Sequence, residues 1–304
     1  MERLKVKLNN LELDNPVIPA SGTYGFGYDY LDFYDPNILG SISLKGTTLH
    51  PRFGNVTPRI AECHMGMLNS VGLQNPGIHK VIEEELVKLD KIYHKKIIFN
   101  VSGFNIDEYV ECVRLLDNID KVGIIEVNIS CPNVKDGGLS FGSDCSSAAS
   151  VTKEVRKVTT KPLFIKLSPN VSNIADIAKS CEDEGADGIS MINTLIGARF
   201  NLKTGKPILH NVTGGFSGPA ILPVALRMVY EVYERVNIPI IGIGGISSAY
   251  DVIEMMYAGA SAIQIGSSNL VDPYTCKKVI DDLPLVMDEL NIKKITDIIG
   301  RAHK

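Results

Sequence analysis

Residues 126–133 carry the sequence Glu126-Val127-Asn128-Ile129-Ser130-Cys131-Pro132-Asn133. With the isoleucines before them, they form an apolar, β-branched run that predicts a buried strand, and the proline marks the change from strand to loop. Cys131, which can transfer a proton, therefore lies where a strand ends, and barrel enzymes keep their catalytic residues at such places. Most cysteines are small buried hydrophobes, but the polar neighbours here favour a site for a planar, hydrogen-bonding substrate.

Short apolar runs alternate with helical patterns along the rest of the chain. We predict strands at 17–20, 41–45, 97–101, 124–129, 163–167, 188–192, 239–242 and 262–265. We predict helices at 79–93, 106–116, 146–158, 174–184, 220–236 and 249–258. Eight strands are what a closed parallel barrel requires, and no break in composition marks a domain boundary. The sequence therefore predicts an α/β fold, a single (β/α)8 TIM barrel domain over residues 1–304.

Two features are expected in addition to the barrel. Apolar residues alternate around Asn9-Asn10 in residues 5–15, which predicts an N-terminal β-hairpin under the barrel. The segments 51–76 and 196–216 are long enough to be inserted active-site loops.

Composition and charge exclude several classes of protein. The chain is 44% hydrophobic and 22% charged, as soluble globular proteins are. Its formal charge of -4 without a basic run argues against a nucleic-acid partner. No apolar run reaches the roughly 18 residues of a membrane span, and the amino terminus begins as a strand instead of a signal peptide. We therefore expect a cytoplasmic protein with no membrane partner.

The cysteines do not form a recognisable metal or disulfide pattern. They lie at positions 63, 112, 131, 145, 181 and 276, with no C-x-x-C pair and no histidine at ligand spacing. We predict free thiols, no metal site, and no iron-sulfur cluster on this chain.

Glycine-bearing turns follow the last two predicted strands, at residues 241–246 and 263–268, and another lies at 214–218. Glycine lets backbone N–H groups approach an anion closely, and the loops after strands seven and eight of a barrel commonly bind phosphate. These turns predict a phosphorylated ligand. The alternative is that the glycines only permit tight turns.

Polar side chains gather at the ends of the predicted strands. Lys45 and Lys166 each close an apolar strand, where a cation is costly to desolvate unless it meets an anion or an electron-rich ring. Four asparagines fall at strand ends or in the adjacent loops: Asn69, Asn100, Asn128 and Asn193. Together they indicate a flat heterocycle bound by hydrogen bonds along its edges. External salt bridges for the lysines, and caps or turns for the asparagines, are the alternatives.

The chain as a whole resembles the dihydroorotate dehydrogenases, flavin enzymes of pyrimidine biosynthesis. The resemblance spans residues 3 to 303 and rests on motifs in this order: Pro19-Ala20-Ser21-Gly22, Lys45-Gly46-Thr47-Thr48, Asn69-Ser70-Val71-Gly72-Leu73, residues 128–133, Lys166-Leu167-Ser168-Pro169, Ile192-Asn193-Thr194 and Gly242-Ile243-Gly244-Gly245-Ile246. The family implies a (β/α)8 barrel that binds one FMN and oxidises (S)-dihydroorotate to orotate.

The resemblance also implies roles for residues. Cys131 matches the base of the class 1 enzymes, which takes a proton from C5 while the flavin accepts a hydride from C6. The implied cofactor-binding residues are Ser21, Lys45, Gly46, Asn100, Asn128, Lys166, Ile192, Gly218, Gly244, Gly245, Gly266 and Ser267. The implied substrate-binding residues are Lys45, Asn69, Ser70, Val71, Gly72, Leu73, Asn128, Asn133, Asn193 and Thr194.

Residues 21–27 and the glycines at 137 and 138 are similar to those of class 1B enzymes. That class implies a partner subunit that carries FAD and a [2Fe-2S] cluster and passes electrons to NAD, with a homodimer of barrels inside a heterotetramer. No G-x-G-x-x-G opens a helix in this chain, so we expect no NAD site here.

Other functions remain open from the sequence. A fumarate-linked class 1A enzyme, or another FMN-barrel oxidoreductase of the dihydropyrimidine dehydrogenase or dihydrouridine synthase type, is the nearest alternative. A barrel aldolase that uses Lys166 as a Schiff base is the non-redox alternative, and a binding protein without activity is a further one.

Overall fold

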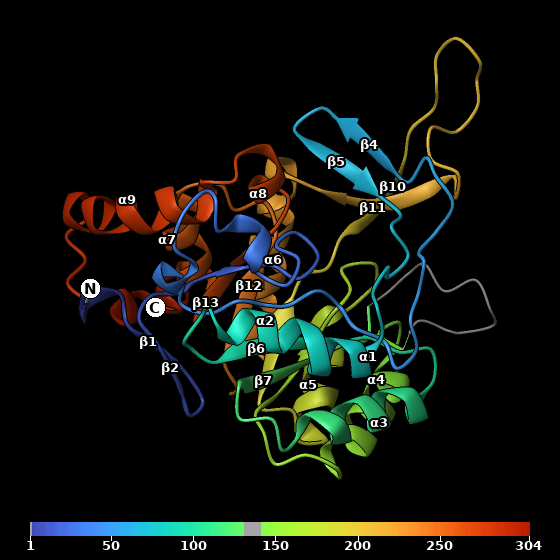
Figure 1. Cartoon of the computed structure of the whole chain (residues 1–304). Coiled ribbons are helices and arrows are strands. Elements are labelled where there is room, and N and C mark those ends of the chain that lie inside the picture. Colours follow the sequence, from blue (N-terminus) through green and yellow to red (C-terminus); the bar gives the residue numbers. More distant parts are fainter. Residues whose placement is uncertain (1, 131–140) are drawn as a thin grey trace.

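The computed structural model describes residues 2–130 and 141–304 and has a parallel barrel at its centre (Figure 1). Its main sheet has seven parallel strands in the order β3-β13-β12-β9-β8-β7-β6. Their bounds are β3 (Val17–Pro19), β6 (Ile97–Val101), β7 (Val122–Asn128), β8 (Leu163–Lys166), β9 (Gly188–Met191), β12 (Ile240–Ile243) and β13 (Ala262–Ile265). These strands are buried on both faces, which explains their continuous apolar sequences.

Residues 40–47 fill the gap between β3 and β6 and occupy the eighth position of the barrel. The Ser43 N–H donates to the Pro19 carbonyl at 3.3 Å, and the Leu44 N–H donates to Ile98 at 3.0 Å. The predicted (β/α)8 barrel is confirmed, with one correction. The predicted strand at 41–45 forms only isolated bridges, because the Lys45 N–H donates to the Gly25 carbonyl instead of continuing the ladder.

Helices follow the strands around the barrel. Ile78–Lys80 (α1), a π-helical turn at Val81–Glu85 (η4) and Leu86–Asp90 (α2) form one continuous run. The others are α3 (Ile106–Leu116), α4 (Cys145–Arg156), α5 (Ile174–Asp183), α6 (Leu222–Tyr233), α7 (Ala249–Ala258), α8 (Ser268–Val271) and α9 (Thr275–Glu289). Four of them begin at a residue whose side chain accepts a hydrogen bond from a backbone N–H of the first turn, and all four are residue types preferred at that position: Asn105, Asp144, Asn173 and Ser248.

Short 3-10 turns connect these elements: η1 (Glu2–Leu4), η2 (Tyr28–Tyr30), η3 (Pro36–Ile38), η5 (Pro219–Ile221), η6 (Ile295–Ile298) and η7 (Arg301–His303). All six predicted helices are present, and the bounds of α3 and α7 match the prediction. The sequence analysis missed α8 and α9. The latter places buried residues at helical spacing, at 276, 279, 283 and 286, so its signal was present.

The predicted N-terminal hairpin is confirmed as β1 (Val6–Leu8) and β2 (Leu11–Leu13), which pair antiparallel. The Asn9 side chain donates to the carbonyl of Asp187, the residue just before β9, at 2.9 Å. A Cβ on Gly123, at the start of β7, would lie 3.2 Å from Leu11. The hairpin therefore lies at the amino ends of the barrel strands.

The two inserted segments form a second sheet, and this corrects their interpretation as loops. Its strands are β4 (Ile60–Cys63), β5 (Gly66–Asn69), β10 (Leu195–Ala198) and β11 (Thr213–Ser217), in the antiparallel order β10-β11-β5-β4. It projects from the barrel on the side away from the hairpin (Figure 1). β5, β10 and β11 are short and carry glycine, which gives them weak β-propensity, and β5 pairs with β11 from far along the chain.

No helix in the described ranges 2–130 and 141–304 is both long and apolar enough to span a membrane.

Candidate active site

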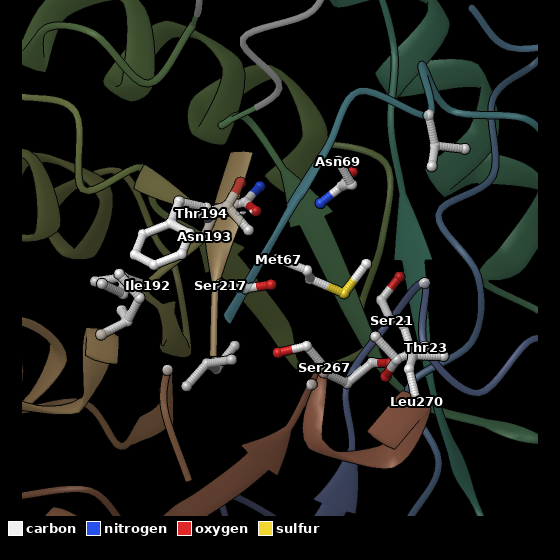
Figure 2. A pocket seen from close by; sticks show the side chains of 18 of the residues that line it. Ser21, Thr23, Met67, Asn69, Ile192, Asn193, Thr194, Ser217, Ser267 and Leu270 are labelled. Carbon is white, nitrogen blue, oxygen red and sulfur yellow. Dashed lines mark hydrogen bonds between the residues drawn. The ribbon is translucent and has the colours of Figure 1, made fainter. Parts of the chain in front are cut away.

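A cavity of about 390 Å³ opens at the carboxyl ends of the barrel strands, where the antiparallel sheet meets the barrel. Its volume lies within the range of small-molecule sites, roughly 300–1,000 Å³. Residues from both sheets line it, because β5 and β11 extend over the ends of the parallel strands. In Figure 2 Met67 projects between two groups of lining residues: Asn69, Asn193 and Thr194 on one side, and Ser21, Thr23, Ser267 and Leu270 on the other.

The cavity brings together nearly all residues that the sequence analysis selected. All twelve predicted cofactor-binding residues line it, as do eight of the predicted substrate-binding residues: Lys45, Asn69, Val71, Gly72, Leu73, Asn128, Asn193 and Thr194. Ser70 does not line it and is fully buried, since its side chain points away from the face that Asn69 and Val71 present. Cys131 and Asn133 lie outside the described residues.

Sequence reasoning missed several lining residues, which are mostly apolar and lack a chemical signal of their own: Ala20, Gly22, Thr23, Ile60, Met67, Phe216, Ser217, Ile221, Ile243, Ile246, Ser268 and Leu270. Met67 could have been found, because it lies two residues before Asn69 on the same face of β5.

The glycine turns leave open space at one end of the cavity. A Cβ built on Gly266 would have a single neighbour within 4 Å, the Cβ of Ala20 at 3.9 Å. By contrast, Gly245 has φ +77° and a Cβ there would meet the backbone of Leu222, where α6 begins. Gly266 therefore has room for a ligand, whereas Gly245 is needed for the path of the chain itself.

Hydrogen bonds connect the asparagines at the other end of the cavity. The Asn193 Nδ2 donates to the Ser130 hydroxyl at 2.6 Å, and that hydroxyl donates to the Asn128 Oδ1 at 2.6 Å. The Tyr109 hydroxyl donates to the Asn128 carbonyl at 2.8 Å. Ser130 is 1% exposed, and its hydroxyl fixes two lining amides, those of Asn128 and Asn193. No role was predicted for Ser130.

The floor of the cavity carries a buried ion pair. Lys166 at the end of β8 is 5% exposed, and its Nζ lies 3.8 Å from Oε1 of the fully buried Glu126 on β7. No role was predicted for Glu126, although a carboxylate inside an apolar strand is a visible signal.

None of the described cysteines lines the cavity. Burial raises the pKa of Cys112, of Cys181 and of Cys276 to about 12, so these thiols stay protonated at neutral pH. Cys63 and Cys145 are more accessible but also lie outside the cavity lining. Within the ranges 2–130 and 141–304, no group of three or more His, Cys, Asp or Glu side chains could hold a metal ion.

Comparison with known proteins agrees with this geometry. The family model for dihydroorotate dehydrogenase matches residues 3–287. The chain belongs to the dihydroorotate dehydrogenase family. Its 304 residues are 53% identical to a protein from Halalkalibacterium halodurans and 54% identical to one from Bacillus mycoides. Both are named dihydroorotate dehydrogenase B (NAD(+)), catalytic subunit, and the alignments cover all of this chain and 99% and 98% of those proteins.

A comparison with solved structures finds the same fold. A solved dihydroorotate dehydrogenase from Eimeria tenella, in complex with ferulenol, superposes with a TM-score of 0.84 over 100% of this chain and 89% of that one. At 23% identity it supports the fold alone. Dihydroorotate dehydrogenases are oxidoreductases, so the predicted enzyme class is confirmed. Neither the aldolase nor the fumarate-linked alternative is favoured by the names of the relatives.

The role of Ser130 in holding these two amides can be tested by the stability of a variant. Ser130→Ala leaves the Asn193 amide without its acceptor and frees Asn128, so we expect a loss of about 1–3 kcal/mol in the free energy of unfolding. Urea denaturation measures it. Ser180→Ala, at a partly exposed serine of α5, is the control and should change the free energy by less than about 0.5 kcal/mol. Equal stability of the Ser130→Ala and wild-type proteins would contradict this role.

Proposed function

We propose that this chain is the catalytic subunit of an NAD-linked dihydroorotate dehydrogenase, which binds FMN in the cavity and oxidises (S)-dihydroorotate to orotate in pyrimidine biosynthesis. The observation that carries the proposal is the convergence of two lysines and four asparagines on one cavity, in a chain more than half identical to relatives of that name. A single domain over residues 1–304 and a cytoplasmic location are parts of the same proposal.

The residues present fit FMN. Gly266 leaves space for a phosphate beside the backbone, and Ser267 adds a hydroxyl there. Asn100 lines the cavity with a buried Oδ1 that has no hydrogen-bond partner among the described residues, so it can accept from a ligand. Lys166 supplies a buried cation to the same cavity. These groups would hold the phosphate, the polar edge and the charge of a flavin nucleotide.

When bound, FMN supplies a hydride acceptor for C6 of dihydroorotate. The residues of this chain bind and orient the substrate and move its proton. The amides of Asn69, Asn128 and Asn193 would hydrogen bond the polar edge of the pyrimidine ring, and Lys45 would face its carboxylate. Cys131, which follows the ordered Ser130, would take the proton from C5 as a thiolate.

The second part of the proposal concerns the electron acceptor. The relatives are named catalytic subunits, which implies a separate partner subunit. We propose that this partner carries FAD and a [2Fe-2S] cluster, and that two barrels and two partners form a heterotetramer.

The cofactor proposal predicts that filling the space beside Gly266 expels the flavin. Gly266→Val adds methyl groups toward the cavity without a backbone clash, so we expect a stable protein that loses most of its yellow colour on purification. Absorbance near 450 nm per chain measures it. Gly245→Val is the contrasting variant: the clash with Leu222 should lower the melting temperature as well. Full flavin occupancy in the Gly266→Val protein would place the phosphate elsewhere.

The base assignment predicts different outcomes for two changes at Cys131. Cys131→Ala should retain FMN and lose on the order of 10² to 10⁴-fold in kcat, because only the proton acceptor is removed. Cys131→Ser should keep slight activity that rises toward high pH, since a hydroxyl is a weaker acid than a thiol. Steady-state rates with an artificial dye measure both. Cys63→Ala, outside the cavity lining, is the control. A near-normal rate for Cys131→Ala would refute the assignment.

The partner proposal predicts how the isolated chain uses acceptors. Alone, it should oxidise dihydroorotate with a dye but reduce NAD efficiently only after the FAD and [2Fe-2S] subunit is added. Rates with dye, NAD and fumarate, with and without the partner, measure this. Efficient NAD reduction by the isolated chain would contradict the partner requirement, and rapid turnover with fumarate would indicate a class 1A enzyme.

A further inference from the structure

Glu126 is a fully buried carboxylate directly beneath the cavity. Among the described residues, it is the sole carboxylate with no solvent exposure, and it does not itself line the cavity. Its position on β7, two residues before Asn128, points its side chain into the barrel on the same face as that lining residue. A carboxylate in such a place is costly unless donors and a cation surround it.

Donors from four strand positions surround this carboxylate. Asn100 on β6 donates to Oε1 at 2.6 Å, and Gln264 on β13 donates to Oε2 at 2.9 Å. The Ser43 hydroxyl, from the segment that closes the barrel, lies 3.4 Å from Oε1. Lys166 on β8 completes the set at 3.8 Å. The carboxylate is therefore held at a fixed place by the barrel itself.

Two of these partners also line the cavity, which links Glu126 to whatever binds there. A carboxylate only accepts hydrogen bonds, so it draws the NH2 group of Asn100 toward itself and turns the Oδ1 of Asn100 away. Lys166 presents its charge to the cavity from a site where Glu126 offsets part of that charge. Glu126 thus acts on the cavity through its neighbours.

We propose that Glu126 is a positioning residue that offsets the charge of Lys166 and so lowers the reduction potential of the flavin. The inference rests on the proposed function, because it requires FMN in this cavity. Reduction adds negative charge to a flavin, which a nearby cation favours and a nearby anion opposes. The pair Glu126 and Lys166 together would set how readily the bound flavin accepts electrons and passes them on.

The test is the midpoint potential of FMN bound to the purified chain, measured against a reference dye. Glu126→Gln removes the negative charge at nearly constant volume. We expect a positive shift, on the order of a tenfold rise in the ratio of reduced to oxidised flavin at a fixed ambient potential. Glu126→Asp keeps the charge and should stay close to the wild-type value. Glu85→Gln, at a buried carboxylate outside the cavity lining that pairs with Lys88, is the matched control and should not shift it.

Lys166→Met removes the positive charge of the pair, whereas Glu126→Gln removes the negative one. With both variants, the test does not depend on Glu126→Gln alone. It should shift the potential to more negative values, and the double variant Glu126→Gln/Lys166→Met should return toward wild type. The double variant also removes both buried charges together, which proteins tolerate better than one unpaired charge. If Glu126→Gln does not fold, the difference between the double variant and Lys166→Met isolates the Glu126 charge.

An unchanged potential in Glu126→Gln, or in the double variant relative to Lys166→Met, would overturn the inference. In that case FMN binding and dihydroorotate oxidation by the wild-type chain would still support the proposed function. If the wild-type chain binds no FMN, the proposed function fails first and this inference fails with it.

Discussion

Closure of the parallel barrel is the constraint on which the rest of this structure depends. Parallel strands have their carboxyl ends at one rim, so the residues that follow each strand are brought together whatever their separation in the chain. Lys45, Asn100, Asn128 and Lys166 come from four successive barrel positions and line one cavity for this reason. The segment 40–47 is the most irregular of the eight positions, yet without it Lys45 would have no fixed place beside β6.

The barrel interior is not uniformly apolar. Its buried strands carry Glu126, Lys166 and Gln264, and the last two both contact the Glu126 carboxylate inside the barrel. A buried polar group without a partner destabilises a core, and the contacts with Glu126 offset part of that cost. This polar layer lies beneath the cavity, and it couples the stability of the barrel to the electrostatic field at the site.

The sequence predicts much of this structure because parallel barrels have strong local signals. The apolar strands and the helices α3 and α7 were found from the periodicity of their apolar residues. The antiparallel sheet was missed because β5 pairs with β11 from more than 140 positions along the chain, and β10 and β11 have short, weakly patterned sequences. The lining lysines and asparagines were found, whereas most of the apolar lining residues, such as Leu270, and the hydroxyl residues Thr23, Ser217 and Ser268 were not. The carboxylate of Glu126 inside an apolar strand was a visible signal, but its partners Asn100, Lys166 and Gln264 come from other strands and could not be read from the local sequence.

The most direct test of the account is an anaerobic titration of the purified chain with dihydroorotate, followed by flavin absorbance and by orotate formation. The account predicts a yellow protein with one FMN per chain, whose flavin bleaches as one orotate forms per flavin, with no added NAD or partner. A colourless protein, or a bound flavin that dihydroorotate does not bleach, would contradict it.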